Sequence, residues 1–146
     1  MRLAIASGKG GTGKTALAVA LATLLPDCRL LDCDVEEPNV SLFLKMQSPT
    51  VTPVCALVPH IDADRCTHCG ECSQFCRFNA LAIAGGKVIV FPELCHGCGG
   101  CTLVCPSGAI TEVANPVGEI ASGPTNGPFL VEGRLDVGQM AAPLVI

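Results

Sequence analysis

The sequence predicts an α/β protein in which part of a parallel sheet is interrupted by a smaller α+β insert. Residues 1–53 alternate short apolar runs with a glycine-rich loop and a helical segment, which is typical of a β-α-β unit. Two closely similar cysteine runs follow between positions 66 and 105, and a glycine- and proline-rich stretch comes after position 113. We therefore expect three segments: residues 1–53, the insert at 54–113, and a linker at 114–146 that returns the chain to the first domain.

Composition limits the class of protein. The formal net charge is −4 and no cluster of Lys and Arg is present, which argues against a nucleic-acid surface. The longest apolar run, at 16–22, is too short to span a bilayer, and no signal-peptide pattern opens the sequence. We therefore expect a soluble, cytoplasmic protein. Its core should be aliphatic, because the chain has five Phe and no Trp or Tyr.

The first segment contains a phosphate-binding motif. Residues 2–6 are short and apolar, as in a buried parallel strand, and the motif G-x-x-x-x-G-K-[ST] follows directly. Glycines let consecutive N–H groups point at phosphate oxygens, and the N-terminus of the next helix adds its dipole. A chance glycine-rich turn is the alternative, but a strand before the loop and a helix after it favour nucleotide binding. The predicted ligands of ATP or ADP are Gly8, Lys9, Gly10, Gly11, Thr12, Gly13, Lys14 and Thr15.

Within this motif, Lys14 should reach the β- and γ-phosphates and the Thr15 hydroxyl should ligate Mg²⁺. A helix is expected over 14–25, apolar on nearly every face and therefore buried. A second buried strand over 29–34 ends in Asp32 and Asp34. Since a β-α-β crossover is right-handed and parallel, both carboxylates should lie near Mg²⁺ and the γ-phosphate. The alternative is that they only cap the end of the strand in water.

The rest of the first segment is less regular. Ser41 would stand near the N-cap of a helix over 41–46. Residues 47–53 are rich in turn formers and mark the first domain boundary.

Both cysteine runs have the spacing C-x2-C-x2-C-x3-C, with which bacterial two-cluster ferredoxins hold two 4Fe-4S clusters. The first three thiolates of a run surround one cluster, and the fourth ligates the other cluster. The expected ligand sets are therefore crossed. They are Cys66, Cys69, Cys72 with Cys105, and Cys95, Cys98, Cys101 with Cys76.

Other metals and disulfides remain as alternatives. One such quartet would suit zinc, but two in tandem favour iron–sulfur clusters. A disulfide framework fits a reducing cytoplasm poorly, and the eight cysteines leave an odd remainder of Cys28, Cys33 and Cys55. These three should be small buried apolar residues. His68 and His96 lie inside complete quartets and should be exposed loop residues.

The remaining segments complete the expected layout. Residues 80–84 and 87–91 should form a hairpin, 114–128 a linker, and 129–131 with 134–137 a hairpin around Glu132 and Gly133. The chain ends in an apolar run at 141–146. No apolar strand after Ile110 ends in the aspartate that holds Mg²⁺ in P-loop enzymes. We therefore expect the N-terminal part of a longer protein.

Lys9 inside the loop, together with Asp32, Asp34 and Asn39, gives the sequence a specific resemblance. It resembles the MinD/ParA/nitrogenase-iron-protein superfamily of P-loop ATPases, in members that contain an inserted two-cluster ferredoxin domain. The resemblance implies that Lys9 reaches the nucleotide of a partner subunit, and that Asp34 positions the attacking water and Mg²⁺. The catalytic residues would be Lys9, Lys14 and Asp34, in a homodimer or with a paired homologue.

Three functions compete. The first is an ATPase coupled to an iron–sulfur module for electron transfer or for metallocofactor or iron–sulfur assembly, with a redox or cluster-acceptor protein as partner. The second is a ferredoxin-type electron carrier with a P-loop half that does not hydrolyse ATP. The third is a cluster scaffold that releases its metal, which enclosed, crossed ligation disfavours. No nucleic acid and no membrane-spanning segment is expected.

Overall fold

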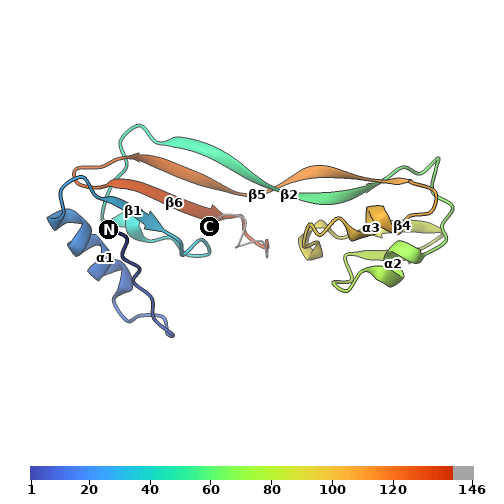
Figure 1. The fold of residues 1–146 in the computed structure, drawn as a ribbon, viewed down its shortest axis with the longest axis horizontal. Coiled ribbons are helices and arrows are strands. Elements are labelled where there is room, and N and C mark those ends of the chain that lie inside the picture. Colours follow the sequence, from blue (N-terminus) through green and yellow to red (C-terminus); the bar gives the residue numbers. More distant parts are fainter. Residues whose placement is uncertain (140–146) are drawn as a thin grey trace. The chain divides into compact units, whose positions relative to one another are not determined.

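The computed structural model describes residues 1–139 of the 146-residue chain. The chain divides into two compact units. Unit 1 comprises Met1–Pro53 and Gly118–Asp136, and unit 2 comprises Val54–Val117 and residues 137–139. Strand β2 (Thr50–Ile61) carries the chain from unit 1 into unit 2, and β5 (Ile110–Pro124) carries it back (Figure 1). The apolar run at 141–146 lies outside the described residues.

Unit 1 contains parallel and antiparallel strand pairs. Strands β1 (Arg29–Asp32) and β6 (Phe129–Leu135) are parallel, and β5 pairs antiparallel with β6 in a sheet of order β1-β6-β5-β2. Leu130 on β6 is fully buried. Gly118 on β5 has no room for a side chain, because a Cβ there would overlap the backbone of Arg134. The prediction of an α/β chain with parallel strands is confirmed in this outline.

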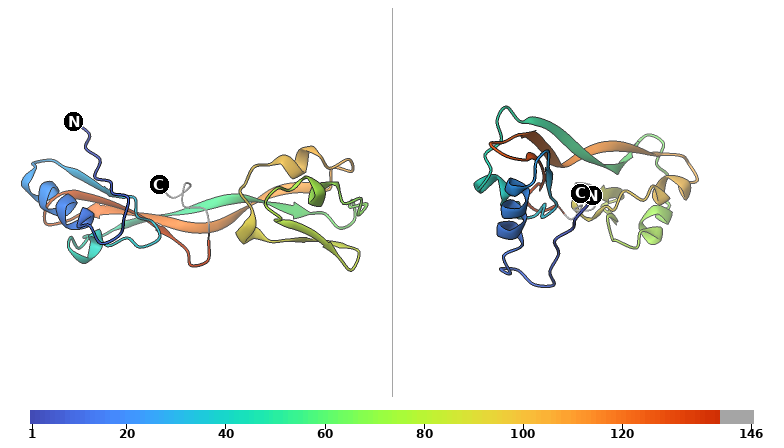
Figure 2. Two further views of the ribbon diagram at one scale, coloured as in Figure 1. Left: turned by 90° about the horizontal axis from the view of Figure 1, so that it is seen from below. Right: turned by 60° about the vertical axis from the view of Figure 1, so that its left-hand side comes forward.

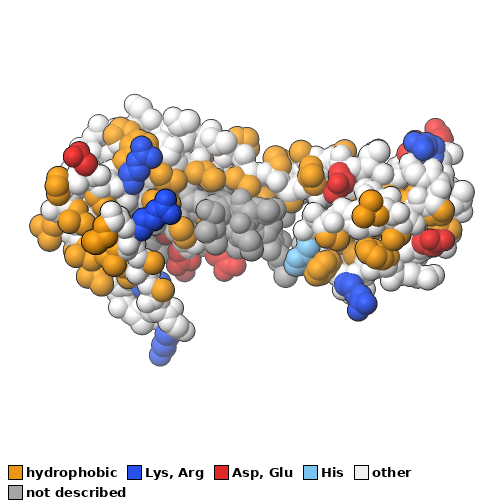
Figure 3. All heavy atoms as spheres, in the orientation of Figure 1, with side chains coloured by type: hydrophobic (Ala, Val, Ile, Leu, Met, Phe, Trp, Pro, Cys, Tyr) orange, Lys and Arg blue, Asp and Glu red, His pale blue; other side chains and the backbone are white. Residues whose placement is uncertain are grey.

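Helix α1 (Lys14–Leu24) begins directly after the glycine-rich loop, as predicted. It ends where Leu25 turns to extended backbone, because the following Pro26 disfavours helical geometry in the residue before it. The helix contacts β1 (Figure 2). Only Ala22 is buried, whereas Leu17 and Leu24 are exposed, so the prediction of a buried helix is wrong. Apolar side chains in Figure 3 are accordingly visible at the surface over α1.

Three other local predictions in unit 1 need correction. Residues 2–6 form no strand, because within residues 1–139 no strand pairs with them and an isolated strand leaves its backbone groups without partners. The helix expected over 41–46 is a single 3₁₀ turn, η1 (Val40–Leu42). The hairpin around Glu132 and Gly133 is one continuous strand, β6, because its residues pair without interruption with β5.

The segment at 114–128, expected to be a linker, is mostly strand. Strand β5 runs to Pro124, and Ala121 is buried where it pairs with Glu132 of β6. Glycine and proline in a strand normally weaken it, but pairing with β6 and burial of apolar side chains outweigh this local preference. Only the turn at 125–128 separates β5 from β6.

Unit 2 is built from short elements. Helices α2 (Glu71–Phe75) and α3 (Gly100–Leu103) are each about one turn long, and the 3₁₀ turn η2 spans Pro92–Leu94. Strands β3 (Leu81–Ala84) and β4 (Lys87–Val90) form the predicted hairpin. Its two-residue turn is Gly85-Gly86, both with positive φ, as the tight hairpin turn requires.

The core of unit 2 is small and contains cysteine. One cluster of buried side chains in it consists of Cys72, Leu81 and Ile110. The partly buried side chains packed against them include Cys76, Cys101 and Cys105. Residues that were predicted to bind metal therefore also contribute to the apolar interior.

Candidate functional site

The glycine-rich loop of unit 1 is held by its own hydroxyl groups. Ser7 donates a hydrogen bond to the carbonyl oxygen of Lys9 over 2.8 Å, and the Thr12 hydroxyl donates to Ser7 Oγ over 2.8 Å. The Leu17 N–H bonds the carbonyl of Gly13 and begins the helical ladder of α1. The two hydroxyl groups therefore stabilise the loop conformation, and α1 begins immediately after the loop.

Two glycines in the loop are required by conformation. Gly11 and Gly13 have φ of +72° and +83°, a left-handed backbone that side chains disfavour. Around Gly8 and Gly10, a Cβ would meet nothing within 4 Å, so the space beside the backbone is open. The loop therefore has exposed N–H-bearing backbone beside the N-terminus of an 11-residue helix, an arrangement that suits an anion.

The charged residues predicted to bind nucleotide lie as follows. Lys9 is exposed on the loop, and Lys14 and Thr15 are half-buried in the first turn of α1. Asp34 is exposed, two residues beyond the end of β1. Among residues 1–139, no hydrogen bond joins Asp34 to the loop. Its part in catalysis, like those of Lys9 and Lys14, stays a prediction.

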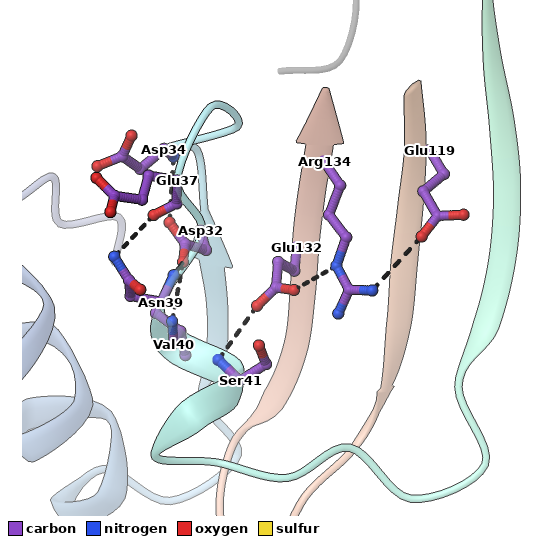
Figure 4. A network of polar contacts seen from close by, with 9 residues as sticks. All are labelled: Asp32, Asp34, Glu37, Asn39, Val40, Ser41, Glu119, Glu132 and Arg134. Atoms are coloured by element: carbon purple, nitrogen blue, oxygen red, sulfur yellow. Dashed lines mark hydrogen bonds and ion pairs between the residues drawn. The ribbon is translucent and has the colours of Figure 1, made fainter. Parts of the chain in front are cut away.

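Asp32 organises the loop that follows β1. Its Oδ1 accepts the N–H of Asp34, and its Oδ2 accepts the N–H groups of Asn39 and Val40, each over 3.1 Å (Figure 4). Both carboxylate oxygens therefore stabilise the backbone of the loop that follows β1. This arrangement is close to the alternative prediction, in which Asp32 only caps the end of the strand. The carboxylate, however, accepts hydrogen bonds from backbone N–H groups of the protein and not from water. The predicted Mg²⁺ role of Asp32 stays a prediction.

Glu132 on β6 is a buried carboxylate that sequence reasoning missed. It is 0% exposed, its Oε2 accepts the Ser41 N–H over 3.1 Å, and its Oε1 pairs with Arg134 over 2.7 Å. Arg134 also reaches Glu119 on β5 over 3.5 Å (Figure 4). An acidic residue two positions from the buried Leu130 in a strand, and therefore on the same face, was the available signal.

Two cavities of unit 2 are lined by cysteines. The first is lined by three cysteines of the first run and the last cysteine of the second run; these are Cys66, Cys69, Cys72 and Cys105. The second is lined by three cysteines of the second run and the last of the first; these are Cys95, Cys98, Cys101 and Cys76. The fold therefore brings the eight predicted cysteines together in two sets of four.

These donor sets fit 4Fe-4S clusters. Such a cluster takes four cysteine thiolates, each on a different iron of the cube, so its ligands surround a cavity. A single zinc ion instead needs its ligands to converge at about 2.3 Å from one point. Among residues 1–139, no group of three or more His, Cys, Asp or Glu side chains is arranged to hold one metal ion. The ligand roles of the eight cysteines stay predictions.

The two cysteine runs adopt the same backbone path. Gly70 and Gly99 precede α2 and α3 with φ of +85° and +68°. His68 and Gly97, two residues earlier, also match with φ of +57° and +62°. After the fourth cysteines the chain turns again at Asn79 (φ +55°) and Gly108 (φ +59°). Unit 2 therefore contains an internal repeat of loop, short helix and turn.

The thiols differ in their surroundings. Burial raises the pKa of the Cys72 and Cys101 thiols above the ordinary value. The pKa of Cys105 is lowered, chiefly because the Ser107 hydroxyl lies 3.6 Å from its sulfur. The N–H of Ala109 also donates to Cys105 Sγ over 3.3 Å. The Cys105 sulfur therefore has two polar neighbours that can stabilise a thiolate.

The second cavity has further lining residues that were not expected. The rings of Phe78 and His96 stack with their centroids 3.8 Å apart and an interplanar angle of 19°. Glu112 and Arg77 line the same cavity. The expectation that His68 and His96 are exposed is confirmed.

The expectation for the three remaining cysteines is wrong. Cys33 and Cys55 are exposed and Cys28 is only partly buried. Cys33 follows the last residue of β1, and Cys55 alternates along β2 with the buried Ala56 and Val58, so it lies on the opposite face of the strand. In the part of the chain that the structure describes, no helix is long and apolar enough to cross a membrane.

Known proteins that are similar to this chain include nucleotide-binding proteins and ferredoxins. Residues 3–141 match the family described as "CobQ/CobB/MinD/ParA nucleotide binding domain". The uncharacterized protein MJ0578 of Methanocaldococcus jannaschii is 35% identical over 149 residues, which cover 100% of this chain and 52% of the relative. The chain spans about half the length of the curated relatives that it matches over its whole length.

Two of the shorter matches are to proteins of the same organism. The uncharacterized ATP-binding protein MJ0547 is 46% identical over 54 residues, covering 34% of this chain and 20% of the relative. The uncharacterized ferredoxin MJ0199 is 42% identical over 53 residues, covering 34% of this chain and 86% of the relative.

Proposed function

Because the chain belongs to the CobQ/CobB/MinD/ParA nucleotide-binding domain family, we propose that it is an ATP-binding iron–sulfur protein. Its loop at 8–15 binds ATP or ADP with Mg²⁺. Unit 2 is an inserted ferredoxin-like module with two 4Fe-4S clusters. In the complete protein, nucleotide hydrolysis is coupled to electron transfer or to metallocofactor or iron–sulfur assembly, with a redox or cluster-acceptor protein as partner. Similarity to an ATP-binding protein and to ferredoxins supports both halves of the proposal.

One observation carries the iron–sulfur half. Each cavity of unit 2 is lined by three cysteines from one run and the fourth cysteine of the other run. Two independent four-cysteine sites would not need this exchange, whereas two-cluster ferredoxins use it. A bound 4Fe-4S cluster would supply one-electron storage. The chain's own contribution is to surround each cluster with apolar side chains and to place hydrogen-bond donors at its sulfurs.

The alternative, an electron carrier with a P-loop half that does not hydrolyse ATP, has one observation in its favour. Glu132 is the buried carboxylate on the strand beside β1, and both its oxygens already accept hydrogen bonds, from Ser41 and Arg134. Both oxygens therefore already stabilise neighbouring groups of the protein. Turnover of ATP by residues 1–146 alone would exclude this alternative.

Metal analysis after anaerobic reconstitution tests the proposal. Two complete clusters require about eight iron and about eight acid-labile sulfide per chain. Stoichiometric zinc without the visible absorbance of iron–sulfur clusters would refute the iron–sulfur half.

Calorimetry with Mg-ATP and Mg-ADP tests the nucleotide half. Lys14→Ala should abolish binding, because it removes the cation that contacts the phosphates. Lys9→Ala should leave binding in this chain intact, since its proposed partner is the nucleotide of another subunit. Equal effects of the two substitutions would refute the distinction between the lysines.

A further inference from the structure

The two halves of the internal repeat differ at the second residue after the fourth cysteine. Ser107 stands two residues after Cys105, and its Oγ lies 3.6 Å from the Cys105 sulfur. Phe78 stands two residues after Cys76, and its ring stacks on His96. The turns at these positions are otherwise alike, with positive φ at Gly108 and at Asn79. One cavity therefore has a hydroxyl group where the other has an aromatic ring.

The direction of the Ser107 contact follows from the chemistry of ligation. A cysteine that ligates iron is a thiolate and has no proton to donate, so the Ser107 hydroxyl must be the donor. Together with the Ala109 N–H at 3.3 Å, it gives the Cys105 sulfur two donors. Hydrogen bonds to cluster sulfur stabilise negative charge, which increases when the cluster is reduced. The carbon and hydrogen atoms of the Phe78 ring offer no comparable donor.

Formal charges also differ between the two cavities. The Arg65 guanidinium donates to the Ser107 carbonyl over 3.3 Å beside the first cavity. The second cavity has both a cation, Arg77, and an anion, Glu112, among its lining residues. Arg65 contacts the backbone carbonyl of Ser107 and not its hydroxyl, so Ser107→Ala leaves this charge in place and tests the hydroxyl alone.

We propose that Ser107 raises the reduction potential of one cluster only, the one held by Cys66, Cys69, Cys72 and Cys105. Ser107 is thus a positioning residue that acts through the Cys105 sulfur and biases an electron in the module toward this cluster. The inference rests on the proposed two-cluster function. It adds to that function a residue that makes the two clusters inequivalent.

Redox titration of the anaerobically reconstituted chain, followed by electron paramagnetic resonance, tests the proposal. Ser107→Ala should make reduction of one cluster less favourable by up to about tenfold, which is about 59 mV for a one-electron couple. The other midpoint potential should not move. Ser107→Thr, which keeps a hydroxyl group, should restore the potential, and Ser107→Val, of the same shape, should not. These two variants compare the hydroxyl group at nearly constant volume.

A matched control comes from the same unit. The Ser73 hydroxyl donates to the Leu81 carbonyl over 2.9 Å and not to a cysteine, so Ser73→Ala should leave both potentials unchanged.

Variants that lose one cluster show which potential Ser107 affects. Cys98→Ala, which damages the second cluster, leaves the first one to be titrated alone, and Ser107→Ala must still shift it. In a Cys69→Ala background, Ser107→Ala should have no effect on the remaining cluster.

The possible outcomes distinguish failure of the proposed function from failure of the proposed role of Ser107. Failure of the unsubstituted chain to load about eight iron would refute the proposed function. Full loading with unchanged potentials in Ser107→Ala, or with the same potential in the Thr and Val variants, would overturn the role of Ser107 alone. An equal shift of both clusters would also overturn it, because a general loosening of the fold would then account for the change.

Discussion

Asp32 on β1 and Glu132 on β6 lie opposite each other in a parallel strand pair and together hold three consecutive backbone N–H groups (Figure 4). Asp32 accepts those of Asn39 and Val40, and Glu132 accepts that of Ser41, each over 3.1 Å. The first N–H groups of a helical turn lack partners within the turn. The two carboxylates therefore fix the end of the loop after β1 and the start of η1.

Loss of the Glu132 carboxylate should destabilise unit 1. In Glu132→Ala, the Ser41 N–H and the Arg134 guanidinium lose an acceptor that is completely enclosed. We expect the free energy of unfolding, measured by urea denaturation, to fall by about 1–3 kcal/mol. Glu132→Gln should lose less, because it keeps an oxygen that can accept the Ser41 N–H.

Glu119→Ala is the control for this prediction. Glu119 pairs with the same arginine over 3.5 Å, but both side chains are substantially exposed, so its loss should change the free energy of unfolding by less than about 1 kcal/mol. Equal effects at Glu119 and Glu132 would show that the ion pair, and not the bond to Ser41, is what matters.

The contact between α2 and α3 depends on the absence of a side chain at Gly100. A Cβ at this position would overlap the ring of Phe75. Gly100→Ala should therefore lower the free energy of unfolding of unit 2 by about 1–3 kcal/mol, measured on the reconstituted protein. Phe75→Leu in the same chain should recover part of the loss by making room. If the double variant were less stable than the sum of the two single changes predicts, the steric explanation would be wrong.

Features determined by local chemistry could be predicted from sequence. The glycine-rich loop and α1 follow from residues 8–25, because glycine conformation, helix propensity and the proline at 26 act over a few positions. The β3–β4 hairpin follows from two glycines between short apolar runs. The spacing of the cysteine runs likewise predicted which four residues line each cavity, since ligand spacing reflects the geometry of the group that is bound.

Features that depend on distant partners could not be predicted. Glu132 bonds the N–H of Ser41, which is 91 positions away, and nothing near either residue indicates the other. The stretch at 114–128 looks like a linker in isolation, and only pairing with β6 makes most of it a strand. Residues 2–6 have a strand-like sequence but no described strand beside them. In each case tertiary pairing overrides local preference.

Removal of the clusters should unfold unit 2 selectively. Several of the predicted cluster ligands pack against the buried residues Cys72, Leu81 and Ile110, so the bound group would support this part of the interior. Treatment with an iron chelator under reducing conditions should abolish amide protection in residues 54–117, measured by hydrogen exchange. Protection in β1 and β6 should persist, because their pairing involves no cysteine of the two runs. Unchanged protection throughout would mean that unit 2 is stable without metal.

The crossed arrangement of the cysteines makes the sharpest prediction. If each run held its own metal, Cys76→Ala would damage the site of Cys66, Cys69 and Cys72. Since Cys76 lines the cavity of the other run, the substitution should instead damage the cluster of Cys95, Cys98 and Cys101. Three remaining thiolates leave one iron corner labile, so electron paramagnetic resonance should show one altered signal beside one intact 4Fe-4S signal.

Double variants assign the altered signal to one of the two clusters. Cys76→Ala combined with Cys98→Ala should damage a single cluster, whereas Cys76→Ala combined with Cys69→Ala should damage both. The inverse pattern would mean that the runs bind metal independently, and the ferredoxin-like module would then be excluded.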